Sequence, residues 1–290
     1  MDGTHVITAH NDPSGLTVHR ILPDGTLGEE VKQTGKLDFG IYGHQVRMDP
    51  SNQTVILVTR GNGPTATKPE DPGALKIFSY KSGVLSNRQT VAPNAGFNYQ
   101  IRHLEFHPSG EWDYATLERQ NKLHVYRRSA DGTLSDAPIF AKDTVVDPGK
   151  AQNGQVASSI HVHPNGRFIY VANRAGATVE FQGRQVFAGG ENTIAVFSIN
   201  QDSGEPTLIQ SADTRGFHPR TFALDPSGSI LAVANQLSGL VRDESRVNTV
   251  PARLTLFRIR NDGKLEYTHQ YDVETGGSRS LFWAGIVSLP

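Results

Sequence analysis

The residues best suited to chemistry in this chain are cationic and polar side chains at the ends of short apolar segments. Nearly all of them are arginines, histidines and amides, with one carboxylate among them: His10, Asn11, His44, Arg60, Arg102, His103, Glu118, Asn173, Arg174, His218, Arg220, Asn235, Gln236 and Arg279. Arginine binds carboxylate or phosphate oxygens in bidentate fashion. Glu118 is suited to take a proton from water or from carbon, with His44 as partner acid or base. The set therefore predicts a site that holds a small organic anion and moves protons.

These residues also have structural interpretations. Glu118 is suited to a salt bridge with Arg102 that holds one repeat together, and Asn173 and Asn235 end their segments in the same register, as residues that cap turns do. The convergence of His44, Arg102, Glu118 and Arg220 favours a functional site over these alternatives. The chain has no Ser-His-Asp order and no nucleophile elbow, so we expect no covalent catalysis.

A repeated turn phrase organises the segments that must position these residues. It occurs as Asp49-Pro50-Ser51-Asn52, His107-Pro108-Ser109-Gly110, His163-Pro164-Asn165-Gly166 and Asp225-Pro226-Ser227-Gly228. The prolines recur at intervals of about 60 residues, and a fixed period of this kind predicts an array of one supersecondary unit.

Residues 100–146 show what one unit contains. Apolar segments at 101–106 and 112–117 flank a turn phrase, and residues 123–126 alternate in polarity as a third strand. Asp131-Gly132 is hairpin-turn chemistry, and a fourth strand follows near Ile139 and Phe140. Four antiparallel strands without an intervening helix are typical of a propeller blade. The predicted fold is all-β, a β-propeller of four-stranded antiparallel blades.

The repeat predicts a single domain over residues 1–290, with about five blades' worth of chain. The expected units are 1–43, 44–100, 101–156, 157–216 and 217–277, with a closing strand at 278–290. The chain opens at the turn of a blade, so we expect residues 280–283 to supply that blade's first strand. In a blade, the start of the first strand and the end of the second lie side by side. Insertions at 61–73, 176–190 and 237–252 should emerge on this same face, so the candidate residues are expected to form one rim.

Composition narrows the classes of function. The 29 Gly and 16 Pro suit many short strands joined by tight turns, and a net charge of −1 argues against a nucleic-acid partner. With no Cys there is no thiolate nucleophile, and one rim carboxylate among guanidinium groups argues against a metal. No apolar run approaches a membrane helix and no signal pattern opens the chain, so we expect a cytoplasmic protein without a membrane partner. We expect no cofactor, and the oligomeric state is left open.

Two segments carry a resemblance to a known family. Residues 101–110, Ile-Arg-His-Leu-Glu-Phe-His-Pro-Ser-Gly, are followed by Glu118, and residues 216–226, Gly-Phe-His-Pro-Arg-Thr-Phe-Ala-Leu-Asp-Pro, are followed by Asn235-Gln236. Through these two segments the chain resembles the lactonase family of seven-bladed propellers, which includes propeller-type 6-phosphogluconolactonases and carboxy-cis,cis-muconate cyclases. The resemblance implies an active site of His44, Arg102, Arg220 and Glu118.

The rim residues beside these four are the expected substrate contacts: His103, Arg174, His218, Asn173, Asn235 and Gln236. The chain departs from the family's pattern at Tyr42-Gly43-His44, where many relatives have His-Pro-His, and at Leu117, where they have asparagine. Members of the family also carry about two further blades ahead of the point where this chain starts.

Three functions remain open. The first is hydrolysis of a small lactone that bears a carboxylate or phosphate. The second is cycloisomerisation, in which the same groups close a lactone from an unsaturated diacid. The third is a non-catalytic propeller that binds a small anion or a protein partner.

Overall fold

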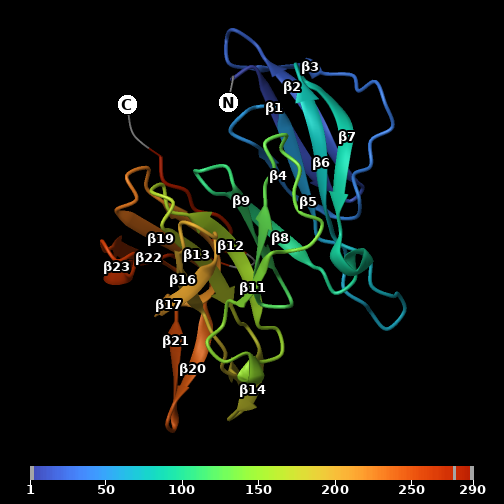
Figure 1. Ribbon diagram of the computed structural model, residues 1–290. Coiled ribbons are helices and arrows are strands. Elements are labelled where there is room, and N and C mark those ends of the chain that lie inside the picture. Colours follow the sequence, from blue (N-terminus) through green and yellow to red (C-terminus); the bar gives the residue numbers. More distant parts are fainter. Residues whose placement is uncertain (1–2, 277–278, 288–290) are drawn as a thin grey trace. The chain divides into compact units, whose positions relative to one another are not determined.

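The computed structural model describes residues 3–276 and 279–287 and contains antiparallel sheets throughout (Figure 1). Its helical elements are two short 3₁₀ turns, η1 (Pro93–Gly96) and η2 (Pro148–Lys150). The predicted all-β fold with four-stranded antiparallel sheets is thereby confirmed. No helix in the described part of the chain is long and apolar enough to span a membrane.

The chain divides into two compact units, which are described separately. Unit 1 comprises Met1–Gln120 and His124–Phe140, and unit 2 comprises Asn121–Leu123 and Ala141–Pro290. The predicted single domain and its blade boundaries stay predictions.

Unit 1 contains a three-stranded and a four-stranded sheet, each with its strands in chain order. The first sheet is β1 (His5–Asn11), β2 (Ser14–Ile21) and β3 (Leu27–Glu30). The second is β4 (Gly43–Met48), β5 (Thr54–Thr59), β6 (Ala74–Lys81) and β7 (Val84–Val91). A third sheet includes residues of both units and has the order β11-β10-β9-β8, with β8 (Ile101–Phe106), β9 (Trp112–Leu117), β10 (Lys122–Arg127) and β11 (Phe140–Asp143).

Unit 2 contains two further four-stranded sheets and two hairpins. The sheets are β12 (Val156–Val162), β13 (Phe168–Arg174), β16 (Thr193–Ile199) and β17 (Pro206–Asp213), then β18 (Phe217–Leu224), β19 (Ile230–Leu237), β22 (Arg253–Ile259) and β23 (Leu265–Asp272). The hairpins are β14 (Thr178–Phe181) with β15 (Arg184–Phe187), and β20 (Gly239–Asp243) with β21 (Arg246–Val250). The hairpins lie in the predicted insertions 176–190 and 237–252, and in Figure 1 β20 and β21 extend beyond the sheet from which they emerge.

The four turn phrases join the first and second strands of the four-stranded sheets, as predicted. In each turn the fourth residue donates its backbone N–H to the carbonyl of the first, as from Gly110 to His107 at 2.9 Å and from Gly228 to Asp225 at 2.9 Å. That fourth residue has a positive φ, 77° at Gly110 and 57° at Asn52, a conformation open to glycine and tolerated by asparagine. The four-residue phrase therefore forms a tight turn through its own local hydrogen bond.

The strand that follows each turn is buried on both faces over most or all of its length. On β5, Val55 and Leu57 pack with residues of β2 and β6, while Ile56 and Val58 pack with residues of β6 and β8. Because both faces are covered, the second strands read as continuous apolar segments instead of alternating ones. In unit 2, Tyr170 on β13 and Val233 on β19 are likewise buried in one core cluster.

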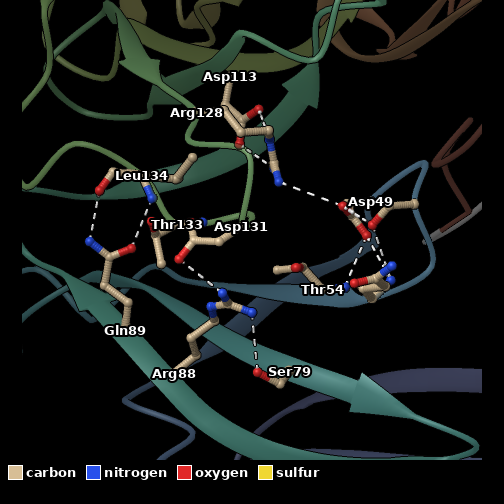
Figure 2. A network of polar contacts seen from close by, with 12 residues as sticks. Asp49, Thr54, Ser79, Arg88, Gln89, Asp113, Arg128, Asp131, Thr133 and Leu134 are labelled. Atoms are coloured by element: carbon tan, nitrogen blue, oxygen red, sulfur yellow. Dashed lines mark hydrogen bonds and ion pairs between the residues drawn. The ribbon is translucent and has the colours of Figure 1, made fainter.

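A polar network in unit 1 links the second sheet to the loop after β10 and to β9 (Figure 2). Arg128 binds the carboxylate of Asp113 in bidentate fashion, with Nε–Oδ1 at 2.9 Å and Nη2–Oδ2 at 2.7 Å. A second carboxylate, Asp49, lies 3.8 Å from Arg128 Nη1 and accepts a hydrogen bond from the backbone N–H of Thr54. Asp113 is fully buried, so this pair is protected from solvent screening.

The same burial makes the stability contributed by Asp113 dependent on pH. Burial raises the pKa of Asp113 to about 6 against an ordinary value of 3.8, although Arg128 lowers it. Between these values the folded chain holds a proton that the unfolded chain has released, so the contribution of this carboxyl to stability falls as the pH rises through the window. We expect the melting temperature of the wild type minus that of Asp113→Asn to decrease from pH 4 to pH 7. A difference that stayed constant or grew with pH would contradict this.

The predicted closing strand over 278–290 is not formed in the part that the structure describes. Residues 279–287 belong to no strand, and positions 278 and 288–290 lie outside the described residues. Leu281 donates its N–H to the Gln236 carbonyl at 3.2 Å, and Ala284 donates to Thr221 Oγ1 at 3.2 Å. The described part of this segment is therefore held beside β18 and β19 of unit 2.

Candidate functional site

The centre of the candidate site in unit 1 is the carboxylate of Glu118. It follows β9 directly, is 7% exposed, and has each of its oxygens bound by a different guanidinium group. Arg102 Nη1 lies 2.8 Å from Oε1, and Arg60 Nη1 lies 3.0 Å from Oε2. The ion pair between Glu118 and Arg102 that the structural interpretation of Glu118 requires is therefore present. Arg60 adds a second pair, so the carboxylate joins residues of two consecutive sheets.

Arg60 is fixed on its other side by an aromatic ring. Its guanidinium lies 4.3 Å from the ring centroid of Tyr42, a cation–π contact, and its side chain is 24% exposed. Arg102, in contrast, is 3% exposed at its side chain. The site thus presents one deeply buried arginine and one that is partly open to solvent.

Two histidines from consecutive sheets complete the group in unit 1. His44 on β4 and His103 on β8 have ring centroids 4.9 Å apart with an interplanar angle of 86°. Both side chains are half-buried. Together with Arg60, Arg102 and Glu118 they place cationic, proton-carrying and proton-accepting groups in one unit.

Strand irregularities explain how these side chains are positioned. On β4 the pairing with β5 shifts between Gly43 and Gln45, so His44 is an extra residue. The same shift occurs between Ile101 and His103, which leaves Arg102 as the extra residue on β8. Such β-bulges redirect a side chain and are frequent next to active sites.

Unit 2 repeats this arrangement at Arg220. The pairing of β18 with β19 shifts between Pro219 and Thr221, so Arg220 is the extra residue. Its guanidinium lies 4.2 Å from the ring centroid of Phe282, in the segment after β23. Arg220 is partly buried, and a ligand that reaches its guanidinium must share it with this ring.

The other predicted residues of unit 2 have well-defined partners. His218 has a φ of 59°, and its Nδ1 lies 3.0 Å from Gln236 Oε1. Its backbone N–H donates a hydrogen bond to Asn192 Oδ1 at 2.9 Å, which fixes the main chain here. The side chain of Gln236 also donates to Ser280 Oγ at 3.2 Å. Arg174, at the end of β13, is 4% exposed.

Asn173 and Asn235 hold consecutive parts of unit 2 together. Each is fully buried, and each donates its amide to the carbonyl of a threonine that follows the preceding sheet: Asn173 to Thr144 at 2.5 Å, Asn235 to Thr214 at 2.9 Å. These contacts agree with the structural interpretation of both asparagines. Contact with a substrate stays a prediction for them.

No set of three His, Asp or Glu side chains within residues 3–276 and 279–287 is grouped so as to hold a metal ion. The donor set around Glu118 is cationic, so it suits an anionic ligand.

The motifs that carry these residues match a known family over most of the chain. The family model described as "Lactonase, 7-bladed beta-propeller" matches residues 1–249. The chain belongs to this lactonase family.

Curated relatives of this lactonase-family chain are named 6-phosphogluconolactonase. The protein of Bacillus subtilis is 31% identical over 258 residues, which cover 87% of this chain and 65% of the relative. The protein of Pectobacterium carotovorum subsp. carotovorum is 27% identical over 294 residues, covering 99% of this chain and 73% of the relative. The chain thus spans about two thirds of the length of these relatives.

Solved structures of low sequence identity share the fold of this lactonase-family chain. The periplasmic gluconolactonase of Pseudomonas aeruginosa has a TM-score of 0.65 at 20% identity, over 94% of this chain and 68% of its own. A protein from Lactobacillus plantarum has a TM-score of 0.67 at 22% identity, over 92% of this chain and 67% of its own.

Sequence reasoning assigned no role to two features of the site. Arg60 was recognised as a rim residue, but its bond to Glu118 joins separate repeats and has no local signal. The bulges do have one: His44, Arg102 and Arg220 each stand six residues before the proline of the following turn phrase. In the remaining repeat the same position is Ser158, which carries no charge and was passed over.

Proposed function

We propose that this lactonase-family chain hydrolyses a small lactone that carries a phosphate or a carboxylate, in the manner of a 6-phosphogluconolactonase. The observation that carries the proposal is the cluster in unit 1, where Glu118 lies between the guanidinium groups of Arg60 and Arg102. A cluster of arginines with a carboxylate suits a substrate that is itself an anion and must gain negative charge at its carbonyl oxygen. The names of the relatives support the same substrate class.

In the proposed reaction Glu118 accepts a proton from water as the water oxygen attacks the lactone carbonyl. Arg102 stabilises the oxyanion that forms at the carbonyl. The ring C–O bond then breaks, and His44 donates a proton to the leaving oxygen, which gives an open-chain hydroxy acid.

Arg60 of unit 1 and Arg220 of unit 2, each within its own unit, are proposed as ligands for an anionic group. Arg60 is partly exposed while Arg102 is buried, so Arg60 is the arginine of unit 1 that a ligand meets first. Arg220 of unit 2 has the same bulged position as Arg102, and an arginine there suits the oxygens of a phosphate or carboxylate.

A panel of lactones assayed by pH-stat tests the proposal. We expect kcat/KM for a phosphorylated or carboxylated sugar lactone to exceed that for the matching neutral lactone by more than about tenfold, because charge-assisted hydrogen bonds are lost with the neutral substrate. Turnover of every lactone at the uncatalysed rate would contradict the proposal. If the protein instead converts an unsaturated diacid and releases no acid, it is a cycloisomerase.

A further inference from the structure

The first strand of a further four-stranded sheet, β12, is bulged at two serines. The pairing of β12 with β13 shifts between Ala157 and Ile160. Ser158 and Ser159 therefore lie together opposite a single residue of β13. Ser158 stands six residues before Pro164, the position that His44, Arg102 and Arg220 hold before their own turn prolines. The bulges at this position in three other four-stranded sheets present predicted site residues, so the serines are candidates for a role in such a site.

Both serine hydroxyls converge on one atom. Ser158 Oγ and Ser159 Oγ each lie 2.8 Å from the backbone carbonyl oxygen of Arg220, to which they donate. Successive side chains of a regular strand point to opposite faces, so two consecutive residues reach the same atom only because the strand is bulged here. Ser158 is fully buried and Ser159 is 7% exposed, so water does not compete effectively for these bonds.

The bonds fix the main chain at the place where Arg220 departs from regular pairing. A carbonyl oxygen has two acceptor sites, and the two hydroxyls fill both. The peptide after Arg220 is thereby held from β12, a strand of the preceding sheet, while β19 pairs with the residues on either side. The direction of the Arg220 side chain depends on the orientation of this peptide.

We infer that Ser158 and Ser159 are positioning residues for Arg220, whose guanidinium they direct toward an anionic ligand. The inference rests on the proposed function for the identity of that anion. The serines act through the bulge and not on the reacting atoms. Removal of the two hydroxyls leaves the charge of Arg220 in place but no longer fixes the direction of its side chain.

The test compares Ser158→Ala, Ser159→Ala and the double variant with the wild type. The double variant is expected to raise KM for the phosphorylated or carboxylated lactone by about tenfold, with kcat and the KM of the neutral lactone nearly unchanged. Each single variant keeps one hydroxyl and should show a smaller rise. Ser211→Ala is the matched control, because Ser211 in unit 2 donates to Glu191 and not to a bulge.

The Arg220→Met background separates positioning from a general structural role. If the serines act through Arg220, removing them in that background costs nothing further. An equal rise of KM with and without Arg220, or equal effects on anionic and neutral lactones, would overturn the inference.

Calorimetric titration with inorganic phosphate keeps the inference separate from the proposed reaction. If the wild type hydrolyses no lactone, the proposed function fails, but weaker phosphate binding in both Arg220→Met and the double serine variant would still support positioning. Phosphate binding that depends on Arg220 and not on the serines would overturn the positioning role. Absence of both turnover and phosphate binding in the wild type would overturn both proposals.

Discussion

Replacement of Glu118 by glutamine is expected to lower the turnover number for an anionic lactone by about 10²–10⁴, the usual contribution of a general base. Glutamine has nearly the same shape and keeps one carbonyl oxygen for Arg102, but it does not accept a proton from water. The measurement is kcat under saturating lactone, with circular dichroism to verify that the variant is folded. Glu118 is the residue of unit 1 with the largest expected effect because its carboxylate also fixes Arg60 and Arg102.

Glu105→Gln is the matched control for this experiment. Glu105 lies further along β8 and forms an ion pair with Arg47, so its replacement also removes an arginine–carboxylate pair of unit 1. It has no part in the proposed site, and we expect its turnover to equal that of the wild type. Unchanged turnover in Glu118→Gln would exclude the role of base. A rise in KM alone would instead make Glu118 a residue that only holds the two arginines.

The fold could be predicted in detail where it depends on local chemistry. The strands at 101–106 and 112–117 have the predicted bounds, because an apolar segment on each side of a proline-containing turn has few other stable arrangements. The expected fourth strand near Ile139 and Phe140 is β11, Phe140–Asp143. The closing strand stays a prediction: the described residues 279–287 form no strand, and the partner of a terminal segment depends on tertiary pairing that no local pattern encodes.

The candidate site was predictable in its residue types but not in its connections. His44, Arg102 and Glu118 were identified from their places at strand ends, and within unit 1 the structure pairs Arg102 with Glu118 and His44 with His103. The bond of Arg60 to Glu118 joins residues of two repeats, so no pattern within one repeat predicts it. The serine pair was missed for a different reason: Ser158 stands at the same distance before its turn proline as the other bulged residues, but it carries no charge.

The largest expected effect on stability follows replacement of Arg128 by methionine. Arg128 is the bidentate partner of Asp113, whose side chain is 0% exposed (Figure 2). Its guanidinium also lies 4.6 Å from the ring centroid of Phe106. Removal of one member of a buried pair leaves an uncompensated charge, which typically costs about 3–5 kcal/mol. We expect a loss of this size in the free energy of unfolding, measured by urea denaturation of the variant and the wild type at pH 7.

The same network contains the control. Arg88 pairs with Asp131 at 2.9 Å, with the two side chains 27% and 56% exposed, so Arg88→Met should cost no more than about 1 kcal/mol. Asp113→Leu combined with Arg128→Met removes both charges and should recover much of the stability lost in Arg128→Met. Because burial sets the pKa of Asp113 at about 6, the cost of Arg128→Met should also shrink below that pH, where the carboxyl carries a proton. Equal losses in Arg128→Met and Arg88→Met would contradict the assignment of this buried pair as the main polar link of unit 1.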